Sequence, residues 1–264
     1  MISKNEIQKI YYLLRLSAAM CFIGHGAFGI ITKPIWCNYF GVFGIGHDMA
    51  YRLMPVVGIF DILFGISMLI FPTRVITLWL IIWGLVTASL RPLSGESFAE
   101  FIERAGNFGV PVAFIILCGG FYKTKKSLTD KMKPPRKLNS ETSKNLNSCL
   151  RITVFLLLLG HGWLNMIEKT GLMNQYKMLG FYQPASTAHF IGMFEILSAI
   201  LILIFPYRPF ILAIFIWKIC SELFYPQYEL FEWIERGGSY AAIISLWYCL
   251  EWKVFQPIKK MYIS

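Results

Sequence analysis

The chain has 264 residues, of which 56% are hydrophobic and only 15% charged, and its mean hydropathy is +0.55. A water-soluble domain of this length could not cover so much apolar surface, so composition excludes that class and indicates an all-α integral membrane protein in contact with the lipid bilayer. The net charge of +10 is concentrated in short basic stretches. Membrane topology explains such stretches better than nucleic-acid binding, which we do not expect.

Long apolar runs indicate the membrane spans. A helix needs about 20 mostly apolar residues to cross about 30 Å of hydrocarbon. Prolines at positions 72 and 206 predict a tight turn between two such runs in each half of the chain. The sequence predicts eight transmembrane helices, at residues 11–31, 50–71, 75–91, 101–121, 149–167, 188–206, 208–225 and 231–252.

The two sets of four spans carry the same motifs in the same order, which indicates a tandem duplication. Ile-Gly-His-Gly at residues 23–26 returns as Leu-Gly-His-Gly at 159–162, and the glycines beside each histidine permit close approach of helices. Gly-x-x-Asp at 58–61 returns as Gly-x-x-Glu at 192–195. We therefore divide the chain into a first four-helix repeat (1–121), a basic linker (122–148) and a second four-helix repeat (149–264).

The distribution of charge predicts how the repeats lie in the membrane. Four spans is an even number, so both repeats enter in the same direction, as parallel repeats related by a pseudo-twofold axis along the membrane normal. Basic loops stay cytoplasmic, so the basic N-terminus, linker and C-terminus (with Lys253, Lys259 and Lys260) are predicted on that side. The opposite side receives the acidic residues Glu96, Glu100, Glu103, Glu229, Glu232 and Glu235.

Histidines, carboxylates and arginines recur at matching depths in the outer half of the predicted bilayer. A carboxylate deep in a membrane is costly, so it usually faces the interior of a helix bundle and has a partner. We expect each histidine to pair with the acid of the second span, and each arginine to stabilise negative charge. The candidate catalytic residues are His25, Asp61, Glu103 and Arg104 in the first repeat and His161, Glu195, Glu235 and Arg236 in the second.

Three interpretations of these residues stay open. In the first, they form a polar network that only holds the helices together. In the second, histidine and carboxylate exchange a proton beside a quinone headgroup. In the third, they bind a divalent metal or a haem. We expect haem less, because a second histidine on a partner span is not present in each half.

The repeats differ at three further charged positions, which are candidate cofactor-binding residues. Lys218 and Glu222 stand where the first repeat has small residues, and their i, i+4 spacing allows them to pair on one helix face. Arg91 is specific to the first repeat, where it offers Asp61 an alternative partner.

Several of these motifs resemble those of the DoxX-like membrane proteins. They are Leu-Arg-Leu at residues 14–16, the glycine-flanked position in the first span and Gly-x-x-Asp/Glu in the second. The most specific piece is Arg-Pro-Leu-Ser-Gly-Glu at 91–96 followed by Glu-Arg-Ala-Gly-Asn at 103–107. The chain is similar to two fused DoxX-like units. The resemblance implies a protein of the cell inner membrane, because members are four-helix inner-membrane proteins. Some members are associated with quinone-linked oxidation of sulfur compounds or with membrane oxidoreductase complexes.

We therefore expect a membrane subunit of an oxidoreductase or electron-transfer assembly that handles a quinone or protons and has a membrane or periplasmic protein partner. A carrier for a small solute or ion, with a site between two parallel halves, is an alternative. A non-catalytic scaffolding subunit is another. The sequence contains no nucleophilic triad, phosphate loop or Cys/His zinc motif, so catalysis of the kind seen in soluble enzymes is not expected.

Overall fold

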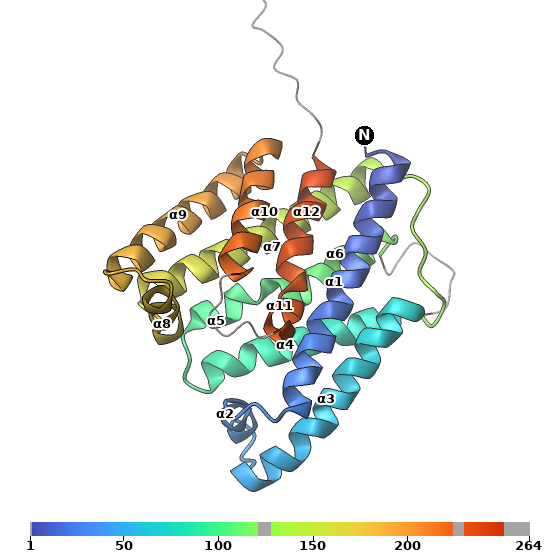
Figure 1. Ribbon diagram of the computed structural model, residues 1–264. Coiled ribbons are helices and arrows are strands. Elements are labelled where there is room, and N and C mark those ends of the chain that lie inside the picture. Colours follow the sequence, from blue (N-terminus) through green and yellow to red (C-terminus); the bar gives the residue numbers. More distant parts are fainter. Residues whose placement is uncertain (1, 121–127, 224–229, 251–264) are drawn as a thin grey trace, which may run out of the picture.

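The computed structural model of the chain describes residues 2–120, 128–223 and 230–250, which form a bundle of α-helices (Figure 1). The first half contains α1 (Lys4–Ile30), α2 (Trp36–Gly41), α3 (His47–Ile70), α4 (Arg74–Leu93), α5 (Phe98–Glu103) and α6 (Ala105–Leu117). The second half contains α7 (Ser140–Met166), α8 (Thr170–Met178), α9 (Pro184–Ile204), α10 (Arg208–Leu223), α11 (Leu230–Glu235) and α12 (Gly237–Cys249). The expectations for Glu229, Lys253, Lys259 and Lys260 fall outside the described residues.

Five of the described helices are long and apolar enough to cross a bilayer, which confirms the all-α class and indicates a membrane protein. These helices are α1, α3, α4, α7 and α9, and they match five of the eight predicted spans. The other three predicted spans contain shorter helices, since α10 has 16 residues and α6 and α12 have 13 each. At about 1.5 Å per residue, the described part of none of these three covers about 30 Å of hydrocarbon as a single straight helix.

Helix α7 begins earlier than the sequence analysis predicted. The segment 122–148 was expected to be a linker, but its last residues, from Ser140 onward, belong to α7. The side chain of Asn139 caps this helix by accepting a hydrogen bond from the Thr142 amide at 2.7 Å. Glu141 adds a negative charge in the first turn, where the helix dipole favours it.

The N-terminal end of α1, the turns at Pro72 and Pro206 and the start of the second half lie at one end of the bundle. Tyr11 on α1 donates a hydrogen bond to the carbonyl of Met132 at 2.8 Å, and the Met132 amide donates to the carbonyl of Pro72 at 2.8 Å. Arg208, at the start of α10, lies 3.7 Å from Glu6. The short helices α2 and α8 lie at the end away from the N-terminus (Figure 1). Segments predicted on one side of the membrane are thus close together.

The fourth predicted span of each half is interrupted, which corrects the expectation of one continuous helix. The interruption falls at Arg104 between α5 and α6, and at Arg236 between α11 and α12. At both positions the amide three residues further on donates to the arginine carbonyl at 2.9 Å, a tighter turn than the α-helix makes. A helix of the other half packs against each interrupted segment, α7 against α5 and α1 against α11. Close contact with this helix explains the local change in backbone.

Equivalent helices of the two halves have equivalent neighbours. Helix α1 packs against α3, and α7 against α9, while α4 packs against α6 and α10 against α12. Helix α1 also packs against α11 and α12, and α7 correspondingly against α5 and α6. Gly106 and Gly238 occupy the same motif position and touch each other, because a methyl group added at Gly106 would lie 3.1 Å from the Gly238 carbonyl carbon. The halves therefore share one core rather than forming separate units.

The arginine of the Leu-Arg-Leu motif caps the C-terminal end of a neighbouring helix. Arg15 on α1 donates hydrogen bonds to the carbonyls of Met68, at 3.0 Å, and Leu69, at the C-terminal end of α3. Arg151 on α7 donates in the same way to the carbonyl of Leu203 near the end of α9. Positive charge at a helix C-terminus satisfies free carbonyls and interacts favourably with the helix dipole. The repeated arginine therefore has a structural role.

Candidate functional sites

The glycine before each histidine allows a segment of the opposite half to reach the site. A methyl group added at Gly24 would lie 2.5 Å from the backbone nitrogen of Glu235, and one added at Gly160 would lie 2.6 Å from the Cα atom of Glu103. Real Cβ atoms do not approach backbone so closely, so only glycine fits at these two positions. The sequence predicted close packing here, but not that the neighbour comes from the other repeat.

The glycine after each histidine allows the second long helix of the same half to approach. A methyl group added at Gly26 would lie 2.5 Å from the carbonyl oxygen of Gly58 on α3. At Gly162 it would lie 2.9 Å from the carbonyl oxygen of Gly192 on α9. Each Gly-His-Gly motif is therefore a crossing point at which two other helices meet the histidine helix.

Each histidine pairs with the carboxylate that the sequence analysis assigned to it. The Nδ1 atom of His25 lies 2.7 Å from Oδ2 of Asp61, and Nδ1 of His161 lies 2.5 Å from Oε2 of Glu195. Asp61 is 2% exposed and Glu195 is fully buried, so neither has water as an alternative partner. Because Nδ1 is engaged, Nε2 is the ring nitrogen of each histidine that is left for a further partner.

The two pairs differ in one contact. In the second half, Trp217 on α10 donates its indole N–H to Oε1 of Glu195 at 3.1 Å. Trp83 on α4 holds the equivalent position in the first half, and its buried indole nitrogen has no hydrogen-bond partner among the described residues. The acid there is Asp61, whose side chain is one methylene shorter than that of glutamate. The second carboxylate is therefore the more firmly held.

This difference predicts that the two tryptophans respond differently to the same substitution. Trp217→Phe removes a hydrogen bond to a buried carboxylate and should lower the free energy of unfolding by about 1.5–3 kcal/mol. Trp83→Phe removes no hydrogen bond within the described residues and should change it by less than about 1 kcal/mol. Unfolding of both variants in mixed detergent micelles measures the two changes in free energy. Equal changes would contradict the hydrogen bond between Trp217 and Glu195.

A cavity lies beside each histidine. The first has a volume of about 80 Å³ and is lined by His25, by residues of α2 and α4, and by Arg104 and Glu235. The second has a volume of about 240 Å³ and is lined by His161, by residues of α8 and α10, and by Glu103 and Arg236. Each cavity thus combines the histidine of one half with the interrupted fourth segment of the other. Arg104 lines both.

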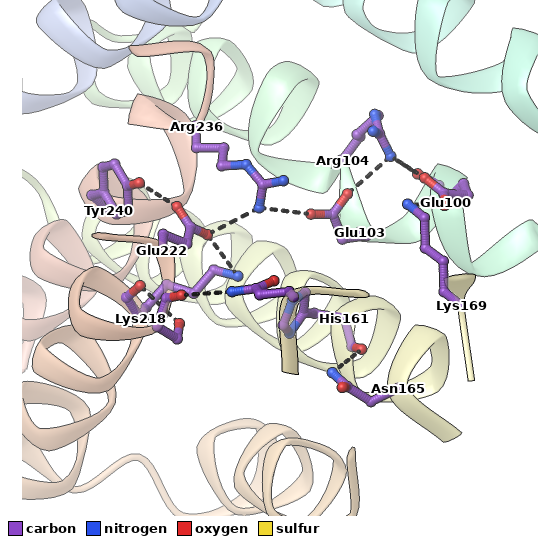
Figure 2. Close-up of polar contacts among 12 residues, drawn as sticks. Glu100, Glu103, Arg104, His161, Asn165, Lys169, Lys218, Glu222, Arg236 and Tyr240 are labelled. Carbon is purple, nitrogen blue, oxygen red and sulfur yellow. Dashed lines mark hydrogen bonds and ion pairs between the residues drawn. The ribbon is translucent and has the colours of Figure 1, made fainter. Parts of the chain in front are cut away.

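A continuous series of ion pairs connects the two cavities, and Figure 2 shows its part from Lys218 to Glu100. It begins with the predicted i, i+4 pair, in which Nζ of Lys218 lies 2.8 Å from Oε1 of Glu222. The pairs that follow are Glu222–Arg236 (3.4 Å), Arg236–Glu103 (3.8 Å), Glu103–Arg104 (2.9 Å), Arg104–Glu100 (2.7 Å), Glu100–Arg91 (3.5 Å) and Arg91–Glu96 (3.1 Å).

Arg91 does not pair with Asp61, which corrects one expectation. It lies instead against Glu96 and Glu100, because α4 ends beside α5 while Asp61 is taken by His25. The other predicted charged residues do meet: Glu103 contacts Arg104 and Arg236, and Glu222 contacts Lys218. Their roles as catalytic or cofactor-binding residues stay predictions.

Glu100 joins charges from three elements. It is 2% exposed, and it contacts Arg104 and the ammonium of Lys169 on the segment before α8. The carboxylate of Glu100 therefore connects the ion-pair series to Lys169.

Some cavity residues were not predicted as part of a site. The ring centres of Trp36 on α2 and His25 are 4.6 Å apart. The hydroxyl of Tyr39 donates a hydrogen bond to the carboxylate of Glu96 at 2.6 Å. In the second half, Tyr176 on α8 donates to Asn165 at 2.6 Å and lines the larger cavity. Aromatic residues are common packing and interfacial residues in membrane proteins, so nothing in the sequence distinguished these.

Comparison of the chain with protein-family models, with characterised proteins and with solved structures gives no match.

Proposed function

We propose that the protein is a membrane subunit of an oxidoreductase assembly and that the cavity beside His161 binds a quinone headgroup. One observation carries the proposal: a buried histidine–carboxylate pair borders a cavity of about 240 Å³ whose wall is charged on the inside and apolar at the rim. Leu179 and Phe181, which line this cavity, are 41% and 47% exposed. A ligand with a polar head and an apolar tail fits such a site.

The residues of this cavity suit the chemistry of a quinone carbonyl. Glu195 holds Nδ1 of His161, so the Nε2 atom is available to donate a hydrogen bond to the carbonyl oxygen when the ring is protonated, or to accept a proton from a quinol when it is neutral. Arg236 supplies positive charge that favours an anionic reduced form. A partner protein, in the membrane or on its outer side, would supply two electrons for reduction of the quinone or accept two electrons from the quinol.

The proposed membrane topology and family follow the sequence resemblance. We propose eight membrane passages in two parallel DoxX-like repeats, in which α5 with α6 and α11 with α12 form the interrupted fourth passage of each repeat. The equivalent helix neighbours of the two halves support this arrangement. We place both termini in the cytoplasm and the protein in the inner membrane, because basic loops stay cytoplasmic and Lys131 of the basic linker lies at the same end of the bundle as the N-terminal part of α1 and the turn at Pro72.

The experiment is a titration of the purified protein, in lipid nanodiscs, with a short-chain quinone, followed by quenching of tryptophan fluorescence. His161→Gln should weaken binding about tenfold, because it removes a hydrogen bond that is worth about 1–1.5 kcal/mol at the headgroup. His189→Gln is the matched control, since His189 is exposed and pairs only with Glu168 at 3.1 Å among the described residues. Equal affinity of the two variants would refute the site.

A further inference from the structure

The cavity beside His25 differs in character from the cavity beside His161. Five aromatic residues line it, namely Trp36, Tyr39, Phe40, Phe43 and Trp83. The faces of aromatic rings carry partial negative charge and attract cations. One such contact exists already at its wall, where the guanidinium of Arg91 lies 5.2 Å from the centre of the Tyr39 ring.

Each arginine at this cavity contacts two acids that lie outside it. Arg91 lies 3.1 Å from Glu96 and 3.5 Å from Glu100. Arg104 lies 2.7 Å from Glu100 and 2.9 Å from Glu103. None of these three glutamates lines the first cavity. Both arginines of the wall therefore already contact carboxylates that lie outside the cavity.

Glu235 is the carboxylate that lines this cavity, and it lacks a direct partner. Within the described part of the chain it forms no hydrogen bond and no ion pair, whereas its counterpart Glu103 contacts both Arg104 and Arg236. Asp61, the other carboxylate near this cavity, is held by His25 at 2.7 Å. The first site therefore places an unpaired carboxylate against an aromatic wall.

We propose that the cavity beside His25 binds a small organic cation, with the aromatic residues around the charge and Glu235 as its counter-ion. Recognition of ammonium groups by aromatic cages with a nearby acid follows the same physical rule. The proposal does not rest on quinone binding beside His161, where the two lining glutamates, Glu103 and Glu222, each have cationic partners.

The test compares choline with 3,3-dimethylbutan-1-ol, which has the same shape without the charge. Calorimetric titration of the protein in nanodiscs should show binding of choline and at least about tenfold weaker binding of the alcohol. Equal binding of the two compounds, or no binding of choline at high millimolar concentration, would overturn the proposal. This comparison uses the unaltered protein and so does not depend on the folding of a variant.

Two variants locate the site. Glu235→Gln should weaken choline binding about tenfold, because it removes the counter-ion. Phe43→Leu should weaken it about threefold through loss of one aromatic face, and Phe43 is 62% exposed, so folding is unaffected. Glu232→Gln on the same helix is the control and should leave affinity unchanged, because Glu232 pairs with Lys33 outside the cavity. Retained affinity in Glu235→Gln would contradict the assignment.

Discussion

Gly160→Ala should destabilise the protein by at least about 3 kcal/mol, although it adds one methyl group. The added Cβ atom would lie 2.6 Å from the Cα atom and 2.9 Å from the Cβ atom of Glu103. Backbone cannot move aside cheaply, so α5 has to shift away from α7. Because Glu103 and Arg104 line the cavity beside His161, quinone affinity should fall with stability.

Gly171→Ala is the matched control for this substitution. Gly171 lies in α8, and a methyl group added there would meet nothing within 4 Å. The free energy of unfolding of this variant should stay within about 1 kcal/mol of the parent protein. Gly24→Ala should repeat the large effect in the first half, since Glu235 occupies the equivalent place. Unfolding by titration with sodium dodecyl sulfate in mixed micelles measures all three, and a mild effect of Gly160→Ala would contradict the packing of the two halves.

Glu222→Leu should be the most damaging single change in the ion-pair series, with a loss of about 3–5 kcal/mol. Lys218 is only 2% exposed, and its ammonium depends on Glu222 at 2.8 Å. Glu222 also accepts a hydrogen bond from Tyr240 and lies 3.4 Å from Arg236. Removal of the acid leaves a buried positive charge without its nearest counter-ion.

The double variant Lys218→Met/Glu222→Leu should recover most of this loss. Two apolar side chains of similar size remove both charges together, and such replacements are often neutral or stabilising. Arg236 keeps its contact with Glu103 at 3.8 Å. The first half supports the expectation, because Gly84 and Ala88 occupy the equivalent positions without any charge. A double variant as unstable as Glu222→Leu would show that the pair itself holds the fold together.

The repeated motifs were enough to predict the histidine–carboxylate pairs. The spacing of Gly58 and Asp61 matches that of Gly192 and Glu195, and an acid in an apolar helix needs a partner, so one histidine in each half was the natural choice. The i, i+4 rule likewise predicted the contact between Lys218 and Glu222, because that contact is local to one helix.

Contacts between the halves could not be predicted in the same way. The positions of Glu103 and Glu235 beside the opposite histidine depend on how α5 and α11 pack in three dimensions, and the sequence of either repeat contains no signal for it. The interruption of the helix at Arg104 was not predicted for the same reason, because it accompanies the packing of α5 against α7. Trp36 and Tyr39 were missed because α2 is short and its aromatic residues resemble those that face lipid.

The most direct test of the account is nitrogen NMR of the protein labelled with ¹⁵N-histidine, in nanodiscs, with and without a short-chain quinone. The sequence contains four histidines, so His161→Gln and His189→Gln assign the relevant signals. We expect the Nε2 resonance of His161 to shift on addition of quinone. Its Nδ1 resonance should keep the chemical shift of a nitrogen that is hydrogen-bonded to a carboxylate, and the His189 signals should stay unchanged. No shift at His161 with saturating quinone would contradict the proposed site.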